Sequence, residues 1–187
     1  MRISHFSALI VCLAWSLAVL PCISALAEVG FDPAGRMMID GKTVFAVGLY
    51  VVEEPRHLPD QRADILARLD DIRNSPFDLL VDYGNVFGTD PQRIELLDEY
   101  QRRGLRVFVN LEGMYPDRWL AAGAPYAGLT AQQAISRAIE PIKNHPAVLG
   151  WYICDEYPKP EAVGEVNRLV RQIDPARPTA VSAAAPR

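Results

Sequence analysis

Short apolar runs alternate with longer amphipathic segments along most of the chain, and this alternation constrains the fold more than any other feature. The apolar runs have the length of strands and span residues 43–50, 77–83, 105–111, 147–154 and 179–185. Strands that are apolar on both faces are typical of a parallel sheet covered by helices. The sequence therefore predicts an α/β fold with parallel strands.

The segments between these runs carry helical signals. Each has an apolar stripe at spacings of three and four residues: Ile65, Leu69 and Ile72; Ile94, Leu97 and Tyr100; Ile135, Ala138 and Ile142; and Val163, Val166, Val170 and Ile173. Asp90 with Pro91 predicts the start of the second helix, and Gly104 predicts its end. Thr130 and Gln133 have the spacing of a capping box before the third helix.

Strand and helix in regular alternation fit two architectures, the eight-stranded barrel and the open doubly wound sheet. A doubly wound nucleotide-binding fold has a glycine-rich turn after its first strand. Here that turn, residues 50–55, has no glycine and carries Glu53 and Glu54. We therefore predict a (β/α)8 TIM barrel over residues 44–187. Since a complete barrel takes about 250 residues, we expect about four βα units plus a fifth strand, with the remaining units outside this sequence.

Residues 1–27 have the three-part pattern of a secretory signal peptide. Arg2 gives a basic start, residues 6–20 are uncharged and largely apolar, and Ala25 and Ala27 are small residues before the expected cleavage after Ala27. The apolar run is shorter than the roughly 20 residues of a spanning helix. We expect a secreted or periplasmic protein with no membrane association after cleavage.

Residues 28–43 are predicted to be a lead-in segment with a short hairpin. Residues 37–39 form the first strand of this hairpin, and Asp40 with Gly41 forms its turn, because both residues tolerate the positive φ that tight turns require.

Composition and motifs argue against several kinds of partner. With 19 Lys and Arg against 23 Asp and Glu, the net charge is −4, and no basic stripe favours nucleic acid. Only Cys154 remains after signal cleavage, so no internal disulfide forms and the thiol is expected to be buried. Because the sequence has no His-x-His or His-Glu-x-x-His pattern, we expect no metal. We also expect no other cofactor.

Polar residues follow the carboxyl ends of the predicted strands, where barrels carry their sites. The candidates for substrate binding are Asp82, Tyr83 and Asn85 after the second strand, Asn110 and Glu112 after the third, and Asp155 and Tyr157 after the fourth. Acids that move protons, amides that bind hydroxyls and rings that stack are typical of carbohydrate chemistry. Glu53, Glu54 and Glu161 are better explained as solvated loop acids. Aromatic residues in the long loop after the third strand, such as Trp119, are predicted to pack that loop rather than to stack on a sugar.

Residues 145–156 form the most informative segment, a predicted buried strand that ends in two acids. The alternation of strand side chains predicts one face with Leu149, Trp151 and Ile153 and another with Tyr152, Cys154 and Glu156. If the aliphatic face meets the helices, Glu156 points into the mouth of the barrel.

This segment resembles the fourth strand of the clan A glycoside hydrolases, which are retaining barrel enzymes. In that family an Asn-Glu pair ends the strand, and the Glu is the acid/base. The turn at residues 40–42 before the first strand also resembles the start of many such catalytic domains. Residues 36–187 resemble this family in the order of their predicted elements. Only residues 145–156 resemble it as a sequence motif.

The resemblance implies that Glu156 is the general acid/base and that Asp155 stands in the place of the family's Asn. That Asn donates a hydrogen bond to a sugar hydroxyl, whereas an ionised Asp can only accept one. The family's nucleophile is a Glu at the end of the seventh strand, which these residues do not contain. The implied function is hydrolysis of O-glycosidic bonds in oligo- or polysaccharides by two carboxylates, with the 187 residues alone inactive. The alternative is a non-catalytic, carbohydrate-binding barrel.

The signal peptide gives the first testable prediction. A bacterium that expresses the protein with its leader is expected to export it with Glu28 as the first residue. N-terminal sequencing of the exported chain tests this, and an exported chain that still begins with Met1 would indicate a membrane anchor instead.

Overall fold

The structure, a computed structural model, describes residues 28–45, 47–77, 79–124 and 126–182. The predicted signal peptide, residues 1–27, lies outside the described residues. Within the described ranges, no helix is both long enough and apolar enough to cross a membrane.

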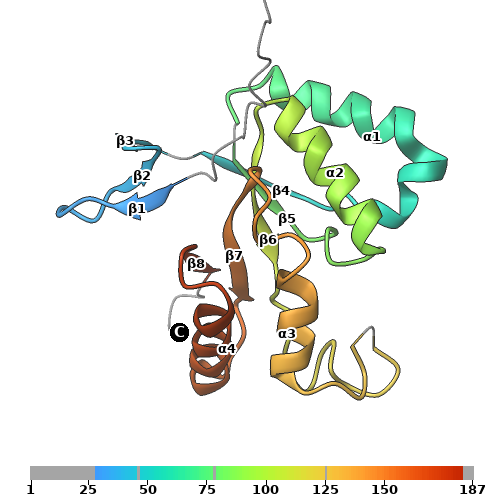
Figure 1. Cartoon of the computed structure of the whole chain (residues 1–187), viewed down its shortest axis with the longest axis vertical. Coiled ribbons are helices and arrows are strands. Elements are labelled where there is room, and N and C mark those ends of the chain that lie inside the picture. Colours follow the sequence, from blue (N-terminus) through green and yellow to red (C-terminus); the bar gives the residue numbers. More distant parts are fainter. Residues whose placement is uncertain (1–27, 46, 78, 125, 183–187) are drawn as a thin grey trace, which may run out of the picture.

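A five-stranded parallel sheet occupies the centre of the molecule (Figure 1). Its strands are β4 (Gly48–Val51), β5 (Leu79–Asp82), β6 (Arg106–Asn110), β7 (Val148–Asp155) and β8 (Thr179–Ser182). They are hydrogen-bonded in the order in which they follow along the chain. A doubly wound sheet reverses its strand order at a switch point, so this order confirms the predicted barrel-type α/β fold.

The helices of the described residues all pack against one face of this sheet. They are η1 (Pro55–His57), α1 (Leu58–Arg73), α2 (Asp90–Arg102), α3 (Ala131–Ile139) and α4 (Pro160–Ile173). A single apolar core joins Leu69 of α1, Leu97 of α2, Ile135 of α3 and Val166 of α4 to strand residues such as Trp151. Helices gather on one face because successive right-handed crossovers between neighbouring parallel strands always return on the same side.

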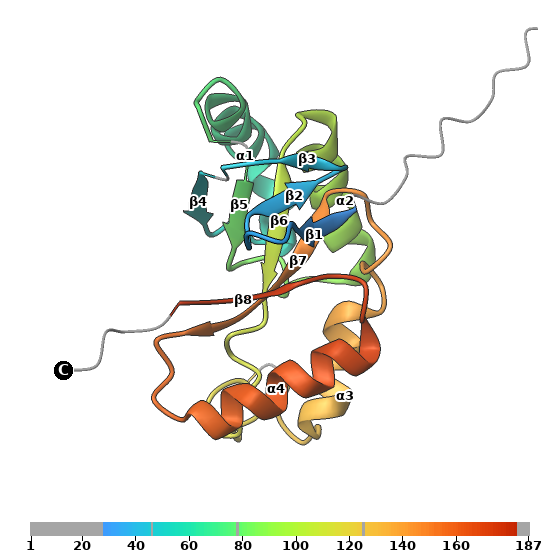
Figure 2. The same cartoon turned by 90° about the vertical axis from the view of Figure 1, so that its left-hand side faces the viewer.

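A small antiparallel sheet covers the opposite face, as Figures 1 and 2 both show. It consists of β1 (Val29–Phe31), β2 (Met37–Ile39) and β3 (Lys42–Thr43). Met37 and Ile39 pack on a second apolar cluster centred on Phe108 and Leu149. The predicted turn between β2 and β3 is confirmed, with φ values of 51° at Asp40 and 74° at Gly41.

The first barrel strand is shorter and more exposed than predicted. The apolar run at residues 43–50 was expected to form one buried strand, but Thr43 ends β3 and β4 begins only at Gly48. Phe45 is 94% exposed and Tyr50 is 58% exposed. The reason is position: within the described part of the chain, β4 lies at an edge of the sheet and pairs only with β5.

The start of α2 also differs from the prediction. Thr89, not Asp90, is the N-cap, and its backbone N–H donates to Gln92 Oε1 at 3.0 Å. Leu96 is fully buried on the inner face, whereas Ile94 is 37% exposed. The predicted apolar stripe of this helix was therefore wrong at its first residue, Ile94.

Other helix signals are confirmed. Gly104 has a φ of 72° after the end of α2. The capping box at α3 is present, with the Gln133 N–H donating to Thr130 Oγ1 at 3.2 Å. Ile135, Ala138 and Ile142 are fully buried.

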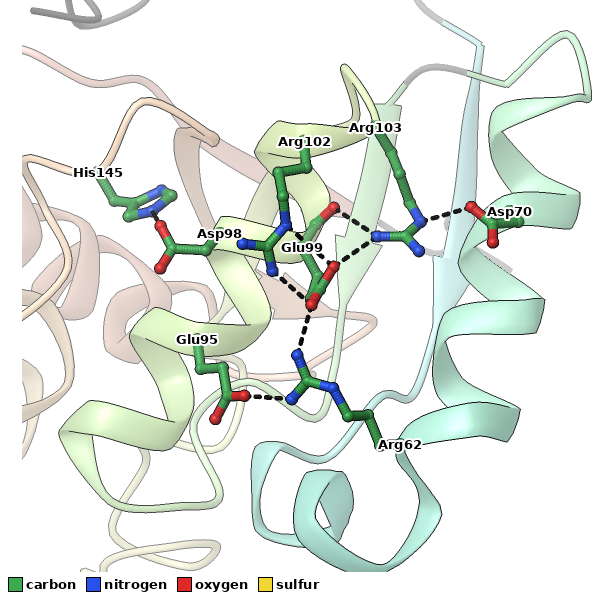
Figure 3. Close-up of polar contacts among 8 residues, drawn as sticks. All are labelled: Arg62, Asp70, Glu95, Asp98, Glu99, Arg102, Arg103 and His145. Atoms are coloured by element: carbon green, nitrogen blue, oxygen red, sulfur yellow. Dashed lines mark hydrogen bonds and ion pairs between the residues drawn. The ribbon is translucent and has the colours of Figure 1, made fainter.

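An ion-pair network joins α1 to α2 around the buried carboxylate of Glu99 (Figure 3). Arg62 of α1 donates to Glu99 at 2.8 Å, and Arg103 donates to it at 2.6 Å and to Asp70 of α1 at 2.8 Å. Arg102 also pairs with Glu99. Burial by itself would raise the pKa of Glu99, but the hydrogen bonds from the arginines outweigh it and lower that pKa.

Beside this network, His145 connects α2 to the start of β7. Its Nδ1 accepts a hydrogen bond from the Ala147 N–H at 3.2 Å, so Nε2 carries the ring proton and faces Asp98 at 3.1 Å. His145 is the first residue of the segment 145–156, and it therefore makes a structural contact with α2.

Removing the charge of Glu99 tests how much the network stabilises the fold. Glu99→Gln is expected to lower the free energy of unfolding at pH 7 by about 2 kcal/mol, because charge-assisted hydrogen bonds are lost. Since the folded-state pKa lies below the ordinary 4.5, this contribution is present above that value and is lost as the pH falls through the folded-state pKa. Urea unfolding at pH 7 and at acidic pH measures the difference.

The matched control is Glu95→Gln on the same helix. Glu95 pairs only with Arg62 among the contacts of the described residues, and its side chain is 44% exposed. Exposed pairs contribute little, so this variant should unfold close to wild type. Equal stability of Glu99→Gln and wild type at pH 7 would contradict the proposed contribution.

Candidate functional site

The carboxyl ends of the parallel strands open into a pocket of about 410 Å³ on the face opposite the helices. Tyr50 of β4, Tyr83 after β5, Asp155 of β7 and Ser182 of β8 line it, together with Val52. These side chains come from distant parts of the sequence. The parallel arrangement brings them to one edge of the sheet, which is where barrel folds carry their sites.

Asp155 is held in this pocket by two tyrosines. The Tyr83 hydroxyl donates to Asp155 Oδ2 at 2.8 Å, and the Tyr152 hydroxyl donates to Oδ1 at 3.2 Å. Burial and the neighbouring Asp155 raise the pKa of Tyr83 to about 12, so this phenol keeps its proton and remains a donor. Tyr50 completes the group, with its hydroxyl 3.4 Å from that of Tyr152.

The three tyrosine rings form a compact aromatic cluster. Their centroids lie 5.6, 5.9 and 5.8 Å apart, at tilted or edge-to-face angles. Such arrangements are favoured for aromatic pairs. The cluster fixes the direction of the hydroxyls that hold Asp155.

The faces of β7 differ from the predicted alternation. Leu149 lies in the same cluster as Tyr152, whereas Cys154, which is buried as predicted, packs in the core on the helix side. The cause is two irregularities of register, one after Val148 and one between Tyr152 and Cys154. As a result Asp155, rather than Glu156, lies on the side of Tyr152.

Gly150 permits the close packing at the first irregularity. A Cβ at this position would lie 2.4 Å from the Pro178 carbonyl oxygen and 2.5 Å from the Phe108 ring. Only glycine fits between these two neighbours without displacing them.

Glu156 follows directly after β7 and is exposed. Its φ of 51° is in the left-handed region, which costs a residue with a Cβ about 1–2 kcal/mol. Its N–H donates to the Ser182 carbonyl at 3.1 Å, which ties this strained backbone to β8. Glu156 lines a second pocket of about 360 Å³ that shares Ser182 with the first.

Asp82 does not reach either pocket. It is fully buried and accepts hydrogen bonds from the Tyr100 hydroxyl of α2 at 2.8 Å and from the Gly84 N–H at 2.8 Å. Its side chain therefore faces the helix layer, on the other side of the sheet from Tyr83. Burial raises the pKa of Asp82 to about 7 in spite of these hydrogen bonds.

The two candidate asparagines are buried and line neither pocket. Asn85 is fully buried, and both side-chain polar atoms lack a partner among the described residues. Asn110 at the end of β6 accepts from the Glu112 N–H at 2.8 Å, while its Nδ2 has no partner within the described residues.

Glu112 and Tyr157 are engaged with the loop after β6. Glu112 pairs with Arg118. Tyr157 stacks on Tyr115 at a centroid distance of 3.9 Å and also borders the Glu156 pocket. Tyr157 donates to Asp117 Oδ1 at 2.6 Å. The structure therefore brings Tyr157 beside Glu156, but does not bring Glu112 into either pocket.

Two expectations about surrounding residues have different outcomes. Glu53 is not a solvated acid: it is 5% exposed and accepts two hydrogen bonds of 2.7 Å from Arg68 of α1. The prediction was wrong because no local pattern indicates that Arg68 faces this turn. The loop aromatics do pack the loop, as predicted, with Trp119 5.3 Å from the Phe87 ring and 6.2 Å from the Tyr126 ring.

Tyr50, Tyr152 and Ser182 are pocket or cluster residues that the sequence analysis did not propose. Tyrosines near the carboxyl ends of three predicted strands were a usable signal for the cluster. Ser182 had no such signal, because a serine in an apolar strand has no chemical context until the strand is placed. Groups of three or more residues able to hold a metal are not found in the part of the chain that the structure describes.

Residues 89–185 match the family described as glycosyl hydrolases family 2, TIM barrel domain. The chain belongs to this family. This confirms the predicted relationship to barrel glycoside hydrolases, and the matched region runs from the N-cap of α2 through β8. No curated protein matches the sequence.

Solved glycoside hydrolase structures share the fold of this family 2 barrel domain. An exo-chitosanase of Amycolatopsis orientalis in complex with PNP-β-D-glucosamine has 13% identity and a TM-score of 0.56 over 86% of this chain and 19% of its own. A glycoside hydrolase family 5 protein of Bacteroides vulgatus has 11% identity and a TM-score of 0.55 over 82% and 39%. A family 5 mannosidase of Rhizomucor miehei has 12% identity and a TM-score of 0.54 over 84% and 56%. The chain thus spans about a fifth of the first structure and about half of the last.

The burial of Asp82 in this barrel domain predicts a pH effect on stability. Because its folded-state pKa of about 7 lies above the ordinary 3.8, the folded protein retains a proton that the unfolded chain releases. Stability should therefore decrease as the pH rises from about 4 to about 7. Asp82→Asn cannot ionise and should lack this decrease.

Urea unfolding across this pH range measures the effect, with Asp71→Asn as the control because Asp71 is an exposed acid of α1. The control should follow wild type. If Asp82→Asn and wild type have parallel pH profiles, Asp82 is ionised in the folded protein and the assignment is wrong.

Proposed function

We propose that this chain is part of the catalytic barrel of a retaining glycoside hydrolase, with Glu156 as the general acid/base. Membership of the family supports glycoside hydrolysis in general as the activity of the whole protein. The role of Glu156 rests mainly on one observation: an exposed carboxylic acid ends β7 in a strained left-handed conformation, beside Asp155. Strained residues with a Cβ cluster at functional sites, where the surrounding structure has to hold them.

The proposed chemistry uses two carboxyl groups. Glu156 protonates the leaving oxygen of the glycosidic bond while a second carboxylate attacks the sugar, and Glu156 then removes a proton from the water that releases the product. The resemblance to clan A assigns the second carboxylate to a seventh strand. We therefore propose that the nucleophile lies outside these 187 residues and that they do not hydrolyse glycosides by themselves.

Substrate binding is proposed for the side of the mouth that carries Asp155. Its carboxylate can accept a hydrogen bond from a polar group of the sugar. Tyr50 and Tyr83 offer aromatic surface beside it. Tyr157 borders Glu156 and is proposed as a neighbouring contact. An oligo- or polysaccharide outside the cytoplasm is the proposed substrate, and this part of the proposal is supported by the sequence of residues 1–27, which has the pattern of a secretory signal peptide.

Substitution of Glu156 in the full-length protein tests the assignment. Glu156→Gln should lower activity on glycosides with poor leaving groups by about 10²–10⁴-fold, the usual contribution of general acid–base catalysis. Activated aryl glycosides need little protonation, so their first step should be much less affected. Azide should partly restore turnover, because it can attack the glycosyl-enzyme without a general base. Steady-state kinetics on both classes of substrate measures these effects.

The control is Glu161→Gln, which removes another exposed acid five residues further along. It should leave the kinetics unchanged. If Glu156→Gln slows both classes of substrate equally and azide has no effect, Glu156 is not the acid/base. If wild type binds sugars but cleaves no glycoside, the non-catalytic carbohydrate-binding barrel is the correct function.

A further inference from the structure

The pocket around Asp155 carries negative charge without a basic neighbour. Its described lining residues are Tyr50, Val52, Tyr83, Asp155 and Ser182, none of which is cationic. The adjoining pocket adds the carboxyl group of Glu156 and, in its described lining, no lysine or arginine. A ligand at this mouth therefore meets the Asp155 carboxylate with no protein cation in either described lining.

Nearby basic side chains have other partners. Arg118 pairs with Glu112, and Lys159 pairs with Asp117 at 2.7 Å. Both of these cations also lie over the Tyr157 ring, at 5.0 and 5.6 Å from its centroid. Among the described residues that line the two pockets, no cation balances the charge of Asp155.

The hydrogen bonds of Asp155 leave room for such a ligand. Each carboxylate oxygen accepts one tyrosine hydroxyl, whereas each oxygen has two lone-pair directions. Tyr50 and Tyr83 border the same pocket, and aromatic rings attract cations. A carboxylate held among tyrosines is the environment that recognises an ammonium group.

We propose that this pocket binds the protonated amino group of an amino sugar. The proposal rests on the proposed function and names the substrate class of the same site. A hydroxyl of a neutral sugar would also donate to the Asp155 carboxylate, but an ammonium group adds the Coulomb attraction between opposite charges, which a hydroxyl lacks. The pocket therefore selects amino sugars over their neutral counterparts, and acetylation of the amino group removes the selected charge.

Binding to the full-length protein tests this independently of catalysis. Calorimetric titration with glucosamine, glucose and N-acetylglucosamine, at a pH where the glucosamine amine is protonated, should show glucosamine binding at least about tenfold more tightly than the other two. Asp155→Asn keeps the size of the side chain and removes its charge, and it should abolish this preference. Raising the salt concentration should weaken it in wild type.

One further variant separates the local charge of Asp155 from the overall charge of the protein. Glu165→Gln removes one negative charge from α4, where Glu165 pairs with Arg168 on the surface, and should leave the preference at the wild-type value. Equal loss in Glu165→Gln and Asp155→Asn would show an effect of overall charge and overturn the proposal.

Kinetics distinguishes failure of this proposal from failure of the proposed function. Faster cleavage of aryl β-D-glucosaminides than of aryl β-D-glucosides in wild type, but not in Asp155→Asn, supports both. Cleavage of the two substrates at equal rates, with equal affinities for glucosamine and glucose, overturns the amino-sugar proposal and leaves the hydrolase intact. Absence of both sugar binding and cleavage overturns both.

Discussion

The handedness of the crossovers between parallel strands determines the rest of this structure. Each connection from β4 to β8 leads to the neighbouring strand in sequence order, so every helix returns on the same face of the sheet. One face then carries the continuous core shared by α1 to α4, and the other carries the smaller cluster under β1–β3. Because all five strands are parallel, their carboxyl ends also lie at one edge, which gives the mouth its polar residues.

Polar residues at that edge divide between the two faces, and this division separates structural from candidate functional acids. Asp82 and Glu53 face the helix layer, where Tyr100 and Arg68 satisfy them. Asp155 faces the opposite side, where tyrosine hydroxyls hold it. The irregular register of β7 assigns Asp155 to that side and leaves Glu156 at the strand end with a positive φ. The buried acids are bound to groups of the helix layer, while Glu156 at the mouth stays exposed.

Prediction from the sequence was most accurate where a signal is local. The capping box at Thr130, the Asp40 turn and the buried stripe of α3 depend on neighbouring residues and were predicted correctly. Errors occurred where a contact across the fold decides the outcome. Asp82 was assigned to the mouth because strand order cannot reveal that Tyr100 of α2 lies beneath it, and the first strand was predicted as buried because an edge position is not visible in an apolar run.

The sequence by itself determined the alternation of strands and helices, and with it the barrel-type sheet and the edge at which any site must lie, because periodicity and turn chemistry are properties of short segments. It also determined that two acids end β7. Only the tertiary structure decided which way each acid points, since a register shift of one residue exchanges the two faces of a strand. Tyr50, Tyr83 and Tyr152 became one cluster around Asp155 for the same reason: their proximity depends on the pairing and packing of separate strands, which no local pattern encodes.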